Sequence, residues 1–237
     1  MVYSVILAGG SSSRMKGPVN KTLIKLCGKS VIRRSVEAFS ALSDQMVVVC
    51  HQDVRQDLIR EVGEASVSCP VGFVNGGNTR QRSVLNGLLS LDIGDEDLVL
   101  VHDAARCLVT PEIIASCLRE ARASGAAIAA IPATDTIKTA VFSEEEEALP
   151  VILDTPDRRT LYQAQTPQGF AFPLILEAYS EAERAGALAS LTDDASAVER
   201  FTKHRVLLTP GSPENIKVTR PLDLAFAESI LHFRISK

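Results

Sequence analysis

From residue 2 to residue 131 the chain alternates short apolar runs with segments of helical periodicity, and this alternation restricts the fold more than any other feature. Continuous apolar runs, typical of strands buried on both faces, occupy residues 2–7, 46–50, 71–74, 98–101 and 126–131. Helical segments are expected at residues 30–42, 54–62 and 80–91 and from Thr110 onward. The alternation predicts an α/β fold with a mostly parallel, doubly wound sheet and helices on both faces.

Residues 132–165 interrupt this pattern. They hold three prolines and the acidic run Glu144–Glu147 between two β-branched pieces, 136–142 and 151–155, which can pair as a hairpin. Two strands alone are too thin to be stable, so we expect this arm, at about residues 134–162, to pack against a second copy of the chain. Helices at 173–185, 192–201 and 221–235 and a strand at 205–208 should follow. Residues 1–237 are therefore expected to form one domain with a protruding β-arm.

Composition excludes several classes of protein. A net charge of −4 without a long basic run argues against nucleic-acid binding. The sequence has no signal-peptide pattern and no apolar run long enough to span a bilayer. The five cysteines are odd in number and form no Cys-x-x-Cys pair, which favours reduced thiols over disulfides or a zinc site. We therefore expect a cytoplasmic protein that binds neither nucleic acid nor membrane.

The loop after the first apolar run has the composition of a triphosphate site. Gly9 and Gly10 let a ligand approach the backbone, three serines add donors, and Arg14 and Lys21 add positive charge. The loop lacks the Gly-Lys-Ser/Thr ending of a P-loop and the spacing of the dinucleotide fingerprint. A plain surface connection remains the alternative for such a loop.

Polar residues also follow the third and fourth expected strands, at the edge where open α/β sheets bind ligands. The third is followed by Gly76, Gly77 and the cluster Arg80–Ser83, and the fourth by the segment His102–Arg106. An aspartate in the position of Asp103 is a frequent Mg²⁺ ligand beside phosphates, with a turn or N-cap aspartate as the alternative.

Two further groups near this edge have weaker signals. His102 beside Asp103 has no accompanying nucleophile motif, so a Ser-His-Asp triad is disfavoured. Lys217 lies on an extended segment before the last helix, where it could contact phosphate or be a surface charge.

Together these segments resemble one enzyme family, the 2-C-methyl-D-erythritol 4-phosphate cytidylyltransferases. The resemblance covers essentially the whole chain and is carried, in order, by the opening loop through Lys21, Val101–Arg106, Asp135–Lys138, Thr166–Gln168, Thr192–Ser196 and Asn215–Pro221. It implies a Rossmann-like nucleotidyltransferase fold, a homodimer made by interlocked β-arms, and a Mg²⁺ cofactor. The implied reaction joins CTP and methylerythritol phosphate into CDP-methylerythritol and pyrophosphate, a step of the non-mevalonate isoprenoid pathway.

The resemblance also implies roles for individual residues. Arg14 and Lys21 look like the pair that stabilises the charged transition state, Lys217 like an α-phosphate contact, and Asp103 like the Mg²⁺ ligand. The cytidine-binding elements would be Ala8, Gly9, Gly10 and the segment from Gly77 through Arg80 to Ser83. Further substrate contacts would come from Ala104, Arg106 and Thr166, and from the arm residues Thr136 and Arg158, which would reach the partner subunit's substrate.

The sequence departs from the family's usual pattern at Gly9, Ser12 and Cys107, and Pro18 lies three residues before Lys21 rather than next to it. These differences bear on the conformation of the loops more than on activity. The family's chemistry agrees with the residues present, because an anionic phosphate nucleophile needs cations rather than a general base. Two alternatives stay open: a ribitol-5-phosphate cytidylyltransferase, and a nucleotide-binding regulatory module without catalysis.

Overall fold

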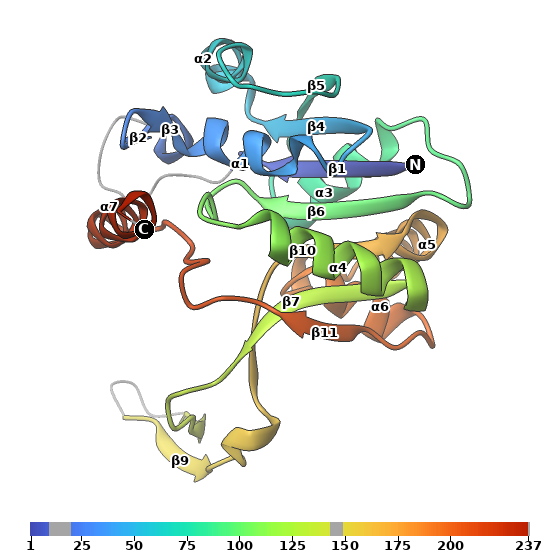
Figure 1. The fold of residues 1–237 in the computed structure, drawn as a ribbon. Coiled ribbons are helices and arrows are strands. Elements are labelled where there is room, and N and C mark those ends of the chain that lie inside the picture. Colours follow the sequence, from blue (N-terminus) through green and yellow to red (C-terminus); the bar gives the residue numbers. More distant parts are fainter. Residues whose placement is uncertain (10–19, 143–148, 237) are drawn as a thin grey trace.

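The computed structural model describes residues 1–9, 20–142 and 149–236, and these build a central seven-stranded sheet in the order β11-β7-β10-β6-β1-β4-β5 (Figure 1). Its strands are β1 Val2–Leu7, β4 Gln45–Cys50, β5 Val71–Asn75, β6 Leu98–Asp103, β7 Ala126–Pro132, β10 Tyr162–Ala171 and β11 Leu207–Pro210. The pairs β1–β4, β1–β6, β4–β5 and β7–β11 are parallel. The predicted mostly parallel α/β sheet is confirmed.

Helices cover both faces of the sheet because the side chains of each strand alternate between them. In β4, Val47 and Val49 pack with helices α3, α5 and α6, whereas Met46 and Val48 pack with α1, α2 and α4. The helices are α1 Val31–Ser40, α2 Gln52–Gly63, α3 Arg80–Leu89, α4 Pro111–Ser124, α5 Phe172–Arg184, α6 Asp194–Phe201 and α7 Pro221–Ile235. The Ser30 hydroxyl accepts from Arg33 N at the start of α1, as predicted for its cap.

Strand β10 was not expected from the sequence. It inserts antiparallel between β6 and β7, so the sheet is mixed at this place. The sequence of β10 is largely polar and contains Pro167, and a proline argues against a central strand. The pairing of β10 with β7 is irregular between Ala164 and Gln168, which accommodates the proline without a regular ladder.

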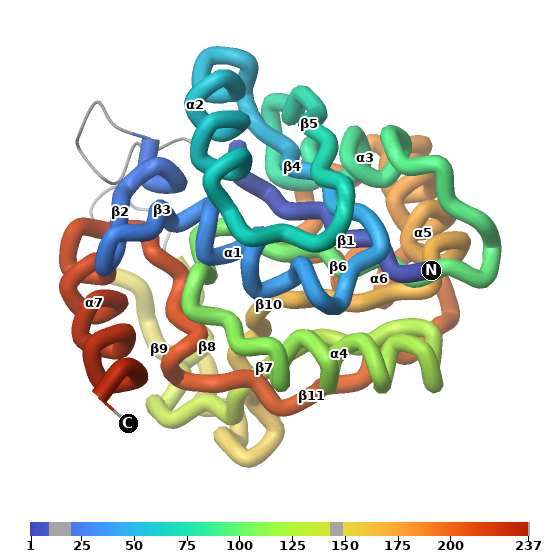
Figure 2. Tube along the Cα trace, turned by 45° about the horizontal axis from the view of Figure 1, so that its top comes forward, coloured from blue at the N-terminus to red at the C-terminus, as the bar shows by residue number. Residues whose placement is uncertain are grey.

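Smaller elements complete the edge where the parallel strands end. A short hairpin of β2 Lys25–Leu26 and β3 Lys29–Ser30 follows the 3₁₀ helix η2 Lys21–Leu23. Leu26 packs with Leu231 of α7, and Figure 2 shows α7 next to this hairpin. Two further 3₁₀ helices in the described part of the chain are η3 Arg158–Thr160 and η4 Leu188–Ser190. Among the described residues, no helix has both the length and the apolar character that a bilayer span requires.

The expected hairpin in the interrupting segment is present as a separate two-stranded sheet, β8 Thr139–Val141 paired antiparallel with β9 Val151–Asp154. It protrudes from the body of the molecule (Figure 1). Its apolar side chains face solvent; Phe142 is 79% and Leu149 84% exposed. The acidic run Glu144–Glu147 at the expected tip lies outside the described residues.

Candidate active site

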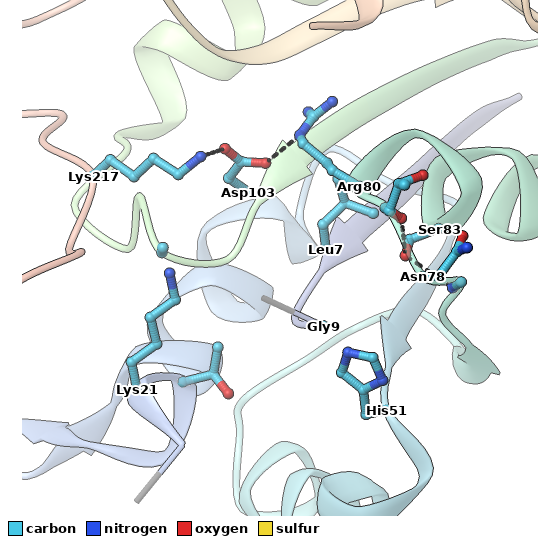
Figure 3. Close-up of a pocket in the computed structure, with 13 residues that line it drawn as sticks. Leu7, Gly9, Lys21, His51, Asn78, Arg80, Ser83, Asp103 and Lys217 are labelled. Atoms are coloured by element: carbon cyan, nitrogen blue, oxygen red, sulfur yellow. Dashed lines mark hydrogen bonds and ion pairs between the residues drawn. The ribbon is translucent and has the colours of Figure 1, made fainter. Parts of the chain in front are cut away.

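A pocket of about 370 Å³ opens at the carboxyl ends of β1, β4 and β6 and at the start of α3 (Figure 3). This is the edge at which open α/β sheets bind ligands, and the volume is that of a small-molecule site. The lining residues are Leu7, Gly9, Lys21, Thr22, His51, Gly77, Asn78, Thr79, Arg80, Ser83, Asp103, Ala105 and Lys217.

The start of α3 forms one wall and depends on two glycines. The N-cap Thr79 accepts from Arg82 N, and Gly77 N donates to Ser83 Oγ at 3.0 Å, so the loop folds back against the first turn. A Cβ on Gly77 would lie 1.9 Å from Arg82 Cγ, and one on Gly76 would lie 3.0 Å from Ser83 Oγ. Only residues without a side chain let this loop lie against the helix.

Three side chains from distant parts of the chain form a row of alternating charge in the pocket. Arg80 Nε donates to Asp103 Oδ1 at 3.0 Å, and Lys217 Nζ lies 2.6 Å from Asp103 Oδ2 (Figure 3). Burial raises the pKa of the Asp103 carboxyl, but the charges of Arg80 and Lys217 outweigh it and hold this pKa well below its usual range. Asp103 is therefore ionised at every pH at which the protein would work.

Lys21 reaches the pocket from η2, whose N-cap Asn20 accepts from Thr22 N. With Arg80 and Lys217 it makes three cations among the described lining residues, against the single carboxylate of Asp103. An excess of positive charge in a recessed site favours a polyanionic ligand.

The residues behind Asp103 are buried and keep it in place. Thr166 Oγ1 accepts from Asp103 N at 3.2 Å and pairs with His102 Nδ1 at 2.9 Å. Burial lowers the pKa of His102 to about 3, so its imidazole is neutral. Because neither Thr166 nor His102 lines the pocket, this pair supports Asp103 and offers no nucleophile to a ligand.

Arg106 also acts from outside the pocket. Its Nη1 donates to the Asn215 carbonyl at 2.8 Å, and the neighbouring Ala105 carbonyl accepts from Val218 N at 2.8 Å. These bonds fasten the extended segment that carries Lys217 to the end of β6.

The site residues implied by the family resemblance therefore fall into groups according to where they lie in the structure. Those that line the pocket are Gly9, Lys21, Gly77, Arg80, Ser83, Asp103 and Lys217. Ala8, Ala104, Arg106 and Thr166 lie outside its lining. Thr136 and Arg158 are exposed on the arm, where Arg158 Nη1 donates to the Thr134 carbonyl at 2.8 Å. Gly10 and Arg14 lie outside the described residues.

His51 is a lining residue that sequence reasoning missed. It directly follows β4 and caps α2 with its backbone, and its ring lies at the pocket (Figure 3). The rule that picked out Asp103, a polar residue directly after a buried strand, applies equally to His51 and would have found it.

The donor set fits a divalent cation that arrives with phosphates. Among the described residues no three His, Cys, Asp or Glu side chains converge as a metal cage. Mg²⁺ usually takes one or two carboxylates, phosphate oxygens and water, and Asp103 is an ionised carboxylate in a pocket that is also lined by three cations. Each of its oxygens has a second lone pair beyond the bond to Arg80 or Lys217.

Comparison with known proteins decides the family. The family model for 2-C-methyl-D-erythritol 4-phosphate cytidylyltransferase matches residues 2–233. The chain belongs to this family. Enzymes of that name from Parasynechococcus marenigrum and Bacillus velezensis are 41% and 39% identical to it; each match covers 98% of this chain, and 99% and 96% of the two relatives.

Solved structures of family members share the fold. The 4-diphosphocytidyl-2C-methyl-D-erythritol synthase of Anaerococcus prevotii superposes with a TM-score of 0.81 at 27% identity, covering 98% of this chain and 96% of that one. The cytidylyltransferase of Thermus thermophilus gives 0.75 at 30% identity, covering 98% and 100%. The resemblance noted in the sequence motifs is thereby confirmed at the level of family and fold.

Proposed function

We propose that this protein transfers the CMP group of CTP to 2-C-methyl-D-erythritol 4-phosphate, giving CDP-methylerythritol and pyrophosphate in the non-mevalonate isoprenoid pathway. The observation that carries the proposal is the cationic pocket at the sheet edge, with Lys21, Arg80 and Lys217 around Asp103, in a chain of this family. Such a pocket suits a reaction in which two anions must meet.

The reaction needs no general base. An oxygen of the acceptor's phosphate attacks the α-phosphorus of CTP and forms a new P–O bond, while the bond from that phosphorus to the bridging oxygen breaks and its electron pair leaves with pyrophosphate. Lys21 stabilises the charge that develops in the transition state, and Arg14 shares this role on the ground of the resemblance. Lys217 holds the α-phosphate side of the reacting groups.

The cofactor of the proposed reaction is Mg²⁺, with Asp103 as its protein ligand. When bound, the ion would neutralise charge on the CTP phosphates and orient them. Arg80 and Lys217 keep the Asp103 carboxylate ionised and in one position before the nucleotide arrives.

The nucleoside end of CTP is assigned to the glycine-lined side of the pocket. Gly9, Gly77 and Ser83 line that side and offer backbone and hydroxyl groups, and Ala8 and Gly10 complete it by resemblance. Ala104, Arg106 and Thr166 shape the site through the segments they support.

The proposed assembly is a homodimer of single-domain chains, residues 1–237, joined by the arm at about 134–162 and working in the cytoplasm. Exposed apolar side chains along β8 and β9 support it, because a second arm would remove them from water. In this assembly Thr136 and Arg158 serve the partner subunit's acceptor phosphate, since both are exposed on the protruding arm and absent from the described lining of their own subunit's pocket.

Pyrophosphate release tests the proposed function. The full-length protein with CTP and Mg²⁺ is expected to release pyrophosphate with methylerythritol phosphate and not with ribitol 5-phosphate. Release with ribitol 5-phosphate instead would assign the alternative acceptor. Tight CTP binding with no release for either acceptor would assign the non-catalytic nucleotide-binding module.

A further inference from the structure

Asp194 lies in the first turn of α6 and is fully buried, with its carboxylate behind the residues that line the pocket. Its two carboxylate oxygens accept from Arg80 Nη1 at 2.9 Å and from Arg80 Nη2 at 2.8 Å. The row of alternating charges in the pocket therefore extends one residue beyond the lining, to Asp194. Along the row, negative and positive side chains alternate in the order Asp194, Arg80, Asp103 and Lys217. None of the proposed reaction steps uses Asp194.

Besides Arg80, two neighbours hold Asp194, one through its carboxylate and one through its backbone. Tyr179 of α5 donates its hydroxyl to Asp194 Oδ1 at 2.6 Å, and burial together with Asp194 raises the pKa of Tyr179 well above its ordinary value, so it stays a donor. Gln168 Oε1 of β10 accepts from Asp194 N at 3.0 Å and from Ala195 N at 2.9 Å. The carboxylate cannot turn without breaking its bonds to Arg80 of α3 and Tyr179 of α5.

This arrangement determines which donors Arg80 directs to the pocket. A guanidinium is a planar fork, and two parallel bonds to one carboxylate fix both its position and its plane. With Nη1 and Nη2 on Asp194, Nε is the donor that reaches Asp103 Oδ1. Burial lowers the pKa of Arg80, but Asp194 and Asp103 outweigh it and raise that pKa well above its ordinary value.

We propose that Asp194, held by Tyr179, is a positioning residue for the nucleotidyl transfer: it orients the Arg80 guanidinium so that Arg80 presents a single donor to Asp103. The inference rests on the proposed function. Without the Asp194 charge, Arg80 would be drawn onto Asp103 with more of its donors, and it would compete there with Lys217 and with any ligand of that carboxylate. The charged groups would then have to rearrange during each reaction cycle.

The substitution Asp194→Asn tests the proposal, since it removes the charge with little change in shape. We expect kcat to fall by roughly 10- to 100-fold, the loss that follows removal of an outer partner that orients a metal ligand, with a much smaller change in the KM for CTP. Asp194 is not among the lining residues, so the groups assigned to the nucleoside are unchanged.

Glu199→Gln is the matched control on the same helix. It exchanges a carboxylate for an amide, as Asp194→Asn does, but Glu199 is exposed on α6 and does not line the pocket. The control should keep a kcat near that of the wild type. An Asp194→Asn enzyme with the same kcat as the control would overturn the proposal.

A double-mutant cycle tests whether Asp194 acts through Arg80. In an Arg80→Ala background, Asp194→Asn should cause no further loss in kcat/KM, because the group that it orients is gone. Equal losses in both backgrounds would mean that Asp194 acts independently of Arg80, against the proposal.

Tyr179→Phe tests the part that Tyr179 plays. It retains the Asp194 charge and removes one bond to it, so kcat should fall by a smaller factor than in Asp194→Asn. An unchanged kcat would remove Tyr179 from the proposal.

These outcomes are separate from a failure of the proposed function. The wild-type protein must first release pyrophosphate from CTP and methylerythritol phosphate. If it does not, the proposed reaction is wrong. If it does and Asp194→Asn matches Glu199→Gln, only the positioning role of Asp194 is wrong.

Discussion

At the scale of single residues, the pocket combines a cation-rich lining with one carboxylate whose charge is secured by its neighbours. Asp103 remains ionised because Arg80 and Lys217 outweigh the cost of its burial. An isolated buried carboxylate would instead take up a proton. The same neighbours that keep Asp103 charged also limit the directions from which a further cation can approach it.

Lys21→Ala should lower turnover much more than stability. Losing one preorganised interaction with transition-state charge typically costs on the order of 10²–10³ in rate, and the proposed role of Arg14 predicts the same for Arg14→Ala. Steady-state kinetics and thermal unfolding measure the two effects. Lys25→Ala is the control, since Lys25 is a half-exposed lysine four residues away that pairs with Glu61 at 3.8 Å and does not line the pocket. Near-normal turnover of a folded Lys21→Ala protein would remove Lys21 from the mechanism.

Asp103→Asn should shift the metal dependence of the reaction. The amide is a weaker ligand for Mg²⁺ and carries no charge, so half-maximal activity should require more Mg²⁺, and added Mg²⁺ should recover part of the rate. A Mg²⁺ titration at saturating CTP measures this. An unchanged titration curve would assign Asp103 a purely structural part in the charged row.

At the scale of elements, the junction of β5 with α3 is the most sterically restricted part of the pocket. The loop turns back so tightly that Gly77 meets the side chain of Arg82, which is itself paired with Glu183 of α5 at 2.5 Å. Gly77 N also donates to Ser83 Oγ of α3, so both sides of the contact are tied to this helix and the wall cannot widen without moving α3.

Gly77→Ala should therefore displace the first turn of α3. Overpacking of this kind costs about 1–3 kcal/mol, and the displaced loop should raise the KM for CTP. Gly63→Ala at the end of α2 is the control, because nothing lies within 4 Å of its Cβ position and its φ is not positive. Equal KM values in the two variants would show that the loop tolerates a side chain and is not a close-fitting wall.

At the scale of the whole molecule, the exposed apolar side chains of the arm have no packing partner within the described part of a single chain. β8 and β9 pair with each other in an arm that lies away from the central sheet (Figure 1), and they carry exposed apolar side chains. An isologous contact between two arms would bury these side chains in both copies. It would also bring Arg158 and Thr136 toward the other subunit.

Mixing two inactive variants, Arg158→Ala and Lys21→Ala, tests whether the site is shared. If Arg158 serves the partner's site, each heterodimer holds one site with both lesions and one intact site. Activity should then rise toward half of the wild-type value within the heterodimers. Each variant incubated alone is the control. Absence of recovery after subunit exchange has been demonstrated by mass spectrometry would mean that each subunit works alone.

Much of this molecule follows from local sequence. Runs of apolar residues between capped helical segments determined the parallel strands and their helices, because burial on two faces requires continuous apolar side chains. The strand-end rule then predicts that Gly77, Arg80 and Asp103 meet at one edge of the sheet. The two pieces of the arm were also predictable, since β-branched runs on either side of a polar turn pair locally.

Tertiary structure alone decided the features that depend on contacts between distant segments. Strand β10 is polar and contains Pro167, so only its neighbours β6 and β7 make it a strand. Asp194 has no local signal that distinguishes it from the cap Asp193; its proposed role arises because the start of α6 meets the start of α3, where Asp194 binds Arg80, 114 residues earlier in the chain. Periodicity reports which face of an element is buried, whereas the partner of a buried charge is set by how the elements pack. This is why much of the pocket's lining could be predicted from the sequence, whereas the carboxylate that holds Arg80 could not.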